Sequence, residues 1–126
     1  MGHPVQHHTI NYVEFSATDV SKAKEFYGGV FGWKFTDYGP DYAAFDHETA
    51  GIDGGFRQAI EGERETDHAR KDGAPLVVLY SADLEATLTA ILNSGGAVIV
   101  PTFDFPGGRR FHFSDGLGNV LAVWSE

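Results

Sequence analysis

A pattern that occurs twice, 64 residues apart, constrains this chain more than any other feature. The stretch DVSKAKEFYGGVFGW begins at Asp19, and the stretch DLEATLTAILNSGGAV begins at Asp83. In each, an Asp suited to cap a helix precedes about three turns of apolar residues at helical spacing, and a pair of glycines follows. Because the offset is close to half of the 126 residues, the chain is predicted to contain two copies of one supersecondary unit.

Short strand patterns surround both predicted helices. Residues 9–17 alternate between apolar and polar side chains, as in a strand with one buried face. Further strands are expected at 33–38, 42–47 and 51–57 in the first half, and at 75–82, 97–101, 109–115 and 119–124 in the second, with a loop over 102–108. Each half is therefore predicted to be a βαβββ module.

The predicted fold is α+β, with two tandem βαβββ modules that form a curved eight-stranded mixed sheet and place their helices on its convex face. Module 1 covers about 9–57 and module 2 about 74–125. Each half alone would bury little surface, so both are assigned to a single domain, 1–126. Segment 58–73 is dense in charge and almost without apolar residues, which predicts a solvated linker.

The two helices are expected to end at their glycine stops. The first should end near Gly28 and Gly29, and the second should span Asp83 to Ser94. The residues predicted to be buried are Val20, Ala23, Phe26, Tyr27 and Val30 in the first helix and Leu84, Leu88, Ile91 and Leu92 in the second.

Two glycine pairs and one histidine have plain structural interpretations. The pairs at 54–55 and 107–108 match neither phosphate-binding motif and do not open a helix, so they are interpreted as bulges and hairpin turns. His47 lies in a predicted turn and is interpreted as a surface residue.

Composition excludes several function classes. The chain has no cysteine, which removes disulfides, thiolate metal sites and cysteine nucleophiles. Its formal charge of −9 opposes binding to nucleic acid or to an anionic membrane surface. There is no apolar run of membrane-spanning length and no secretory signal pattern at the start, which predicts a cytoplasmic protein with a small-molecule or protein partner.

Two motifs resemble those of a known family. The stretch 19–33, DVSKAKEFYGGVFGW, and the terminal stretch 113–124, FSDGLGNVLAVW, are similar in sequence and order to motifs of the vicinal oxygen chelate superfamily. That superfamily includes glyoxalase I, bleomycin-resistance proteins and extradiol dioxygenases. The resemblance spans residues 9 to 125 and implies the fold predicted above, a cavity on the concave face of the sheet, and a homodimer.

The resemblance also implies positions for a divalent metal, because the family's enzymes hold one with two side chains from each module. Those positions fall on Tyr12, near Gly55, on Leu76 or its neighbour Val77, and on Ala122. Phenol and aliphatic groups cannot replace histidine or carboxylate ligands. We therefore expect no bound metal and no other cofactor.

Strand alternation predicts which side chains line the concave face, if Val13, Phe15, Val77, Leu79, Phe111, Phe113, Leu121 and Val123 face the helices. The other face would then hold Tyr12, Glu14, Ser16, Asp53, Arg57, Tyr80, Arg110, His112, Val120 and Trp124. Convergence of Glu14, Asp53 and His112 on a cation is the alternative for this face, but Arg57 and Arg110 would oppose it.

The leading functional hypothesis is a metal-free protein that binds a small organic ligand in this cavity. Tyr12, Tyr80 and Trp124 would supply aromatic contact. Arg57 and Arg110 would fix an anionic group, and Glu14 would fix a cationic or hydroxyl group. Ser16 and Asp53 complete the predicted ligand-binding set.

Two alternatives remain open on the sequence. One is a glyoxalase- or isomerase-type lyase with Glu14 as the base and His112 as its partner, with or without a noncanonical divalent metal. The other is a dimeric scaffold or regulatory module. The sequence does not identify the ligand, and it leaves open whether each cavity forms within one chain or across two.

Overall fold

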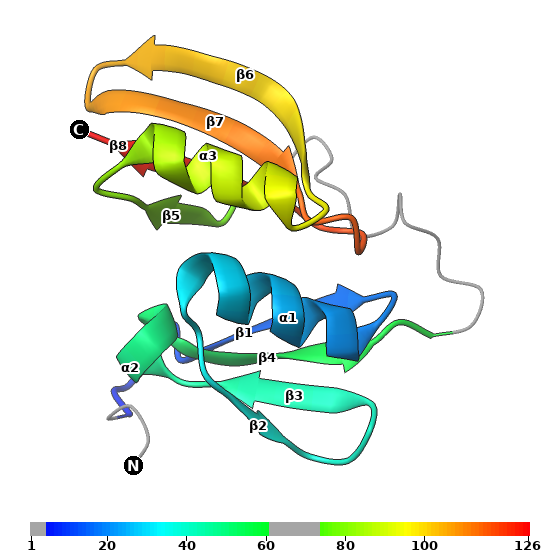
Figure 1. Cartoon of the computed structure of the whole chain (residues 1–126). Coiled ribbons are helices and arrows are strands. Elements are labelled where there is room, and N and C mark those ends of the chain that lie inside the picture. Colours follow the sequence, from blue (N-terminus) through cyan, green and yellow to red (C-terminus); the bar gives the residue numbers. More distant parts are fainter. Residues whose placement is uncertain (1–4, 61–73) are drawn as a thin grey trace. The chain divides into compact units, whose positions relative to one another are not determined.

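Each of the two predicted helices begins directly after the aspartate expected to cap it. In the computed structural model, which describes residues 5–60 and 74–126, helix α1 spans Val20–Phe31 and helix α3 spans Leu84–Asn93 (Figure 1). Asp19 Oδ1 accepts a hydrogen bond from Lys22 N at 3.2 Å, and Asp83 Oδ1 accepts one from Ala86 N at 3.1 Å. The prediction of equivalent helix starts is therefore confirmed.

The chain divides into two units, 1–63 and 64–126, and each contains one four-stranded mixed sheet. The first unit holds β1 (Tyr12–Ala17), β2 (Phe35–Asp37), β3 (Tyr42–Phe45), a short helix α2 (His47–Ala50) and β4 (Asp53–Gln58). The second holds β5 (Val78–Tyr80), β6 (Ala97–Phe105), β7 (Gly108–Ser114) and β8 (Val120–Ser125). The division falls within the predicted linker 58–73, of which residues 61–73 lie outside the described residues.

The two sheets have the same topology. Their strand orders are β1-β4-β3-β2 and β5-β8-β7-β6. In each, the first strand pairs with the last in parallel, and the other pairings are antiparallel. The repeat in the sequence thus corresponds to a repeat in the structure, and the α+β fold of tandem βαβββ modules is confirmed.

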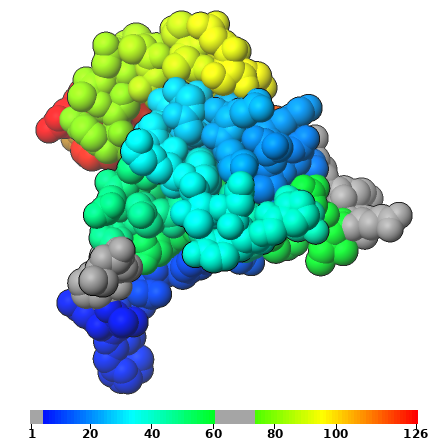
Figure 2. Space-filling model, turned by 60° about the horizontal axis from the view of Figure 1, so that its bottom comes forward, coloured from blue at the N-terminus to red at the C-terminus, as the bar shows by residue number. Residues whose placement is uncertain are grey.

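In each unit the helix covers one face of the sheet, and the core of that unit lies between its helix and its sheet (Figure 1). In the first unit the ring of Tyr27 on α1 packs against Phe56 and Trp33, with ring centroids 4.8 and 5.0 Å away. In the second unit the predicted inward residues Phe111, Phe113, Leu121 and Val123 are buried, together with Leu84 and Ile91 of α3. Residues 5–11, in dark blue, precede β1 and protrude from the first unit (Figure 2).

The ends and faces of the helices differ from the prediction in two places. Helix α1 does not end at Gly28 and Gly29 but continues to Phe31, whose ring packs 5.9 Å from that of Tyr27. Gly32 is the residue that ends it, in a left-handed conformation with φ of 74°. Leu92 was predicted to be buried but is 48% exposed, because it lies about 100° around α3 from the buried Ile91.

Two predicted connections are also corrected. The turn expected at residues 47–51 contains helix α2, which begins because the Asp46 carboxylate accepts a hydrogen bond from Glu48 N. Most of the loop expected at 102–108 is strand, since β6 continues to Phe105 after two register shifts, and Phe103 pairs with Arg110. Pro101 is tolerated in β6 because this strand lies at an edge of its sheet.

Gly54 and Gly55 are neither a bulge nor a turn; they lie in the middle of β4 in regular pairing. A Cβ atom at Gly54 would overlap the Val13 carbonyl oxygen and the Phe45 ring. A Cβ atom at Gly55, on the opposite face, would lie 2.5 Å from the hydroxyl oxygen of Tyr42. Both positions therefore need glycine because a neighbouring group occupies the space of a side chain.

We predict that Gly54→Ala destabilises the protein by about 1–3 kcal/mol, the usual cost of overpacking a core. Gly29→Ala is the matched control, because nothing lies within 4 Å of the added methyl group and the site is within α1. The control should stabilise the chain by about 0.5–1 kcal/mol. Denaturant unfolding measures both, and a Gly54→Ala protein as stable as the wild type would contradict the close approach described here.

Candidate functional site

Three side chains on the face of the first sheet opposite α1 form one hydrogen-bonded group. Tyr12 and Glu14 alternate with apolar residues on β1, and Tyr42 lies on β3, two strands away. The side chain of Tyr42 crosses the intervening strand over Gly55. Its hydroxyl donates to Glu14 Oε1 at 2.8 Å and lies 2.5 Å from the hydroxyl of Tyr12. We refer to this group as the Tyr12–Tyr42–Glu14 chain.

The direction of the protons in this chain follows from the number of donors. An ionised carboxylate only accepts, so the single hydroxyl proton of Tyr42 is used on Glu14. The short contact between the phenols then requires Tyr12 to be the donor and Tyr42 the acceptor. The lone pairs of the Tyr12 oxygen remain available to accept a hydrogen bond, so this oxygen is the terminal acceptor of the Tyr12–Tyr42–Glu14 chain.

The environment of Tyr42 holds its phenol in the neutral form. Burial raises the pKa of the Tyr42 hydroxyl well above its usual value of about 10, and the hydrogen bonds with Tyr12 and Glu14 raise it further. Loss of its proton would place a phenolate beside the Glu14 carboxylate. Tyr42 therefore remains a hydrogen-bond donor throughout the physiological pH range.

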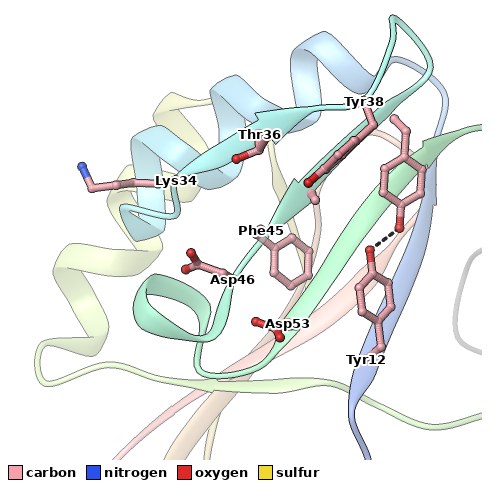
Figure 3. Close-up of a pocket in the computed structure, with 9 residues that line it drawn as sticks. Tyr12, Lys34, Thr36, Tyr38, Phe45, Asp46 and Asp53 are labelled. Carbon is pink, nitrogen blue, oxygen red and sulfur yellow. Dashed lines mark hydrogen bonds between the residues drawn. The ribbon is translucent and has the colours of Figure 1, made fainter. Parts of the chain in front are cut away.

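Tyr12 and Tyr42 also form part of the wall of an open pocket of about 570 Å³ in the first unit (Figure 3). We refer to it as the tyrosine pocket; its lining residues are Tyr12, Lys34, Thr36, Tyr38, Tyr42, Ala44, Phe45, Asp46 and Asp53. They come from β1, from β2 and the residues that flank it, from β3, from the residue before α2, and from the first residue of β4. The walls are aromatic, and the carboxylates lie near α2 (Figure 3).

The backbone and side chain of His47 fix the Asp53 carboxylate at the pocket. Asp53 Oδ1 accepts a hydrogen bond from His47 N at 2.8 Å and lies 3.1 Å from His47 Nδ1. His47 is thus half-buried and bonded, and not the surface turn residue that the sequence suggested. Asp46 is the N-cap of the same short helix, so α2 positions both acids of the pocket.

The predicted site residues of the first unit have four different surroundings. Tyr12 and Asp53 line the tyrosine pocket. Glu14 is not among the lining residues and reaches the pocket through the two phenols. Arg57 Nε lies 3.8 Å from Glu14 Oε2, so its charge is directed at an acid of the protein. Ser16 is buried, with 8% exposure, beside Arg57 in the sheet register.

Two of the predicted site residues of the second unit line a smaller hollow. Arg110 and Trp124 line a pocket of about 220 Å³ together with Val78, Phe105 and Gly107. The guanidinium of Arg110 lies over the rings of Phe103 and Phe105, 5.3 and 5.5 Å from their centroids.

Tyr80 and His112 complete the predicted set of the second unit. The Tyr80 ring packs 5.1 Å from that of Trp124, and its hydroxyl donates to Glu126, which raises the pKa of the Tyr80 phenol. His112 lies with its ring 5.9 Å from Phe103. It belongs to a different unit from Glu14, so their proposed partnership stays a prediction.

Seven lining residues were missed from the sequence; they are Lys34, Thr36, Tyr38, Tyr42, Ala44, Phe45 and Asp46. Tyr42 had a signal, because strand alternation over 42–45 places it and Ala44 on the face opposite the buried Ala43 and Phe45. The others depend on where the β2–β3 hairpin and α2 place them, which local patterns do not specify.

The side chains at the family's metal positions do not fit a metal ion. Tyr12 is a phenol bonded to Tyr42, Gly55 has no side chain, and Leu76 and Ala122 are aliphatic. Within residues 5–60 and 74–126, no three His, Cys, Asp or Glu residues are grouped so that they could hold an ion. No step that depends on a metal is derived for this site. No helix in the same part of the chain is long and apolar enough to cross a membrane.

Comparison with known proteins identifies the family. The family model of the Glyoxalase/Bleomycin resistance protein/Dioxygenase superfamily matches residues 9–123. The chain belongs to this superfamily. The sequence resemblance is thereby confirmed, together with the fold that it implied.

Three relatives show how the match is distributed. The chain is 30% identical over 129 residues to a glyoxylase-like domain-containing protein of Didymella fabae, covering 94% of each. It is 30% identical over 127 residues to the anthracycline biosynthesis protein DnrV of Streptomyces peucetius, covering 91% of this chain and 46% of DnrV. The crystal structure of a glyoxalase-related enzyme from Fulvimarina pelagi superposes with a TM-score of 0.74 at 15% identity, covering 94% of this chain and 88% of that one.

The coverage limits what the relatives imply. The chain spans about half the length of the first bacterial proteins it matches, 45% for the mycobacterial protein CFP32 and 46% for DnrV. At 15% identity, the Fulvimarina structure supports the fold alone.

We predict that the protein loses stability above pH 10 partly through Tyr42. Because the folded pKa of Tyr42 is raised above the unfolded value of about 10, its contribution is fully present below pH 10 and is lost as the pH rises further. Unfolding free energies measured between about pH 9 and 11 should therefore fall less steeply for Tyr42→Phe than for the wild type. Tyr38→Phe is the control, since Tyr38 is 68% exposed, and an unchanged slope in Tyr42→Phe would refute the assignment.

Proposed function

We propose that the chain binds a small organic ligand with an aromatic ring in the tyrosine pocket, without a metal ion. The observation that supports this most directly is the pocket itself, an opening of about 570 Å³ whose lining combines aromatic side chains with a few fixed polar groups. Ligand sites for small molecules have this size and composition. The aromatic residues Tyr12, Tyr38 and Tyr42 supply faces and edges against which a ligand ring can stack.

The fixed polar groups give the pocket a means of selection. The hydrogen bonds of the Tyr12–Tyr42–Glu14 chain hold the Tyr12 oxygen in place, and a hydrogen bond from His47 N holds the Asp53 carboxylate. Groups fixed before binding lose little freedom when a ligand arrives, which improves affinity. The printed name of DnrV associates that relative with anthracycline biosynthesis, which supports a small organic molecule as the class of ligand.

The absence of a metal stays a prediction, and it rests on Tyr12, Leu76 and Ala122 at the family's ligand positions. Metal analysis of the untagged protein, after dialysis against a chelator, should find far less than one equivalent of zinc, nickel, manganese or iron per chain. One tightly held divalent ion per chain would contradict the prediction. Its release by Tyr12→Phe or Asp53→Asn would then locate it in the first unit.

A second candidate function is proton transfer on the bound molecule, and the Tyr12–Tyr42–Glu14 chain is the observation that favours it. A proton leaving an acidic C–H of the substrate would pass to Tyr12 as the Tyr12 proton passes to Tyr42 and the Tyr42 proton to Glu14. The electron pair would stay on the substrate as an enolate. Glu14 would then be the terminal base, as the lyase or isomerase hypothesis requires.

Glu14→Gln separates the two candidates. The amide keeps the volume and can still accept from Tyr42, so ligand affinity should change little. The amide cannot act as a base, so the rate at which the substrate proton exchanges with deuterium oxide should fall by about 10²-fold or more. Homodimer formation and a cytoplasmic location stay predictions, and sedimentation of the purified protein tests the first.

We predict that ligands found in a thermal-shift screen bind through the pocket walls. Tyr38→Ala removes an exposed wall ring and should weaken binding about tenfold, which corresponds to about 1.4 kcal/mol of stacking. Tyr38→Phe keeps the ring and is the matched control. Ala44→Trp should block the pocket and abolish binding. Ligands that bind these variants as well as the wild type occupy another place, and the proposal would be wrong.

A further inference from the structure

We infer that the tyrosine pocket selects ligands whose aromatic ring bears a cationic amine, and that it discriminates against anionic ligands. This inference rests on the proposed function and specifies the ligand class for the same site. It depends on the proton order of the Tyr12–Tyr42–Glu14 chain and on the charges of the lining residues, which are independent observations.

The first observation is that the hydroxyl proton of Tyr12 is directed away from the ligand. Glu14 takes the proton of Tyr42, and Tyr42 takes the proton of Tyr12. A tyrosine usually offers a ligand either a donor or an acceptor, but here the donor is already used. A ligand that meets Tyr12 must therefore bring a hydrogen-bond donor of its own.

The second observation is the balance of charge in the lining. Asp46 and Asp53 are both acids, and Lys34 is the one cation among the nine lining residues. The ammonium of Lys34 extends away from Asp53 and Tyr12 (Figure 3). The part of the lining that contains Tyr12 and Asp53 therefore presents acceptors and negative charge, and Asp46 adds a second acid.

The guanidinium of Arg57 does not offset these negative charges, because it is directed at Glu14. Arg57 was expected from the sequence to fix an anionic group of the ligand. Its Nε lies 3.8 Å from the Glu14 carboxylate, and Arg57 is not among the residues that line the pocket. Among the nine described lining residues, an anionic ligand would thus meet two carboxylates and no guanidinium.

A ligand ammonium satisfies both observations at once. Its N–H groups can donate to the Tyr12 oxygen or to a carboxylate of the lining, and charge-assisted bonds to a carboxylate are about twice as strong as neutral ones. The tyrosine faces attract a cation as well. A neutral alcohol supplies one donor without charge, and a carboxylate supplies none.

Three probes of one shape test the inference: 2-(2-naphthyl)ethylamine, 2-(2-naphthyl)ethanol and 3-(2-naphthyl)propanoate. Binding is followed by the amide NMR signals of Thr36 and Ala44, which lie in the pocket wall. We expect the amine to bind at least tenfold more tightly than the carboxylate, with the alcohol between them. The preference of the pocket for the amine should shrink as salt is raised, because exposed charges are screened.

Two variants separate the sources of the preference. Asp46→Asn removes a charge but keeps a side chain that can cap α2, and it should reduce the amine-to-carboxylate ratio about threefold or more. Tyr12→Phe removes the acceptor and should weaken the amine and the alcohol alike. Glu25→Gln changes the net charge by the same amount on an exposed position of α1 and should leave the ratio unchanged.

The outcomes distinguish this inference from the proposed function. If the carboxylate binds the pocket as tightly as the amine, the charge preference is wrong and the pocket remains a ligand site. If none of the three probes, nor any ligand from the thermal-shift screen, shifts the Thr36 and Ala44 signals, the pocket is not a ligand site and both proposals fall. An amine preference that survives both Asp46→Asn and Tyr12→Phe would overturn the assignment to these groups.

Discussion

The absence of side chains at two adjacent positions of β4 is the constraint on which the first unit depends. Gly54 lets the Phe45 ring and the Val13 carbonyl approach the strand from the core side. Gly55 lets Tyr42 cross the strand on the opposite side and reach Glu14. Because successive residues of a strand face opposite sides of the sheet, one glycine serves the core and the other serves the pocket. The same pair of glycines therefore permits both the packing of the core and the hydrogen bonds of the site.

The sequence specified those features that depend on local pattern. Asp19 and Asp83 were identified as helix starts because capping aspartates followed by apolar spacing are a local signal. The inward faces of β7 and β8 followed from alternation alone. By contrast, the extension of β6 to Phe105 depends on pairing with β7 through register shifts, and the run TFDFPGG resembles a loop when read without its partner strand.

The candidate site was predicted less completely than the fold, for a related reason. Alternation placed Tyr12, Glu14 and Asp53 on the correct face, but which groups bond to one another depends on distances across three strands. Tyr42 was missed because its role comes from a ring that leans over a glycine on the neighbouring strand. Arg57 was assigned to the ligand because alternation does not show that Glu14 Oε2 lies 3.8 Å from Arg57 Nε. A residue's chemistry can be read locally, whereas its partner cannot.

The register of the two sheets shows how one module came to support two different surfaces. Glu14 pairs with Gly55 in the first unit, and at the equivalent place in the second Val78 pairs with Ala122. Likewise Tyr42 pairs with Arg57, whereas Arg110 pairs with Trp124. The hydrogen-bonded acid and phenols of one unit are therefore replaced in the other by apolar side chains and an arginine lying over phenylalanine rings. Side chains on this face do not form the buried core under the helix, so the duplicated fold tolerates their exchange, and each surface can acquire its own charge and its own ligand preference.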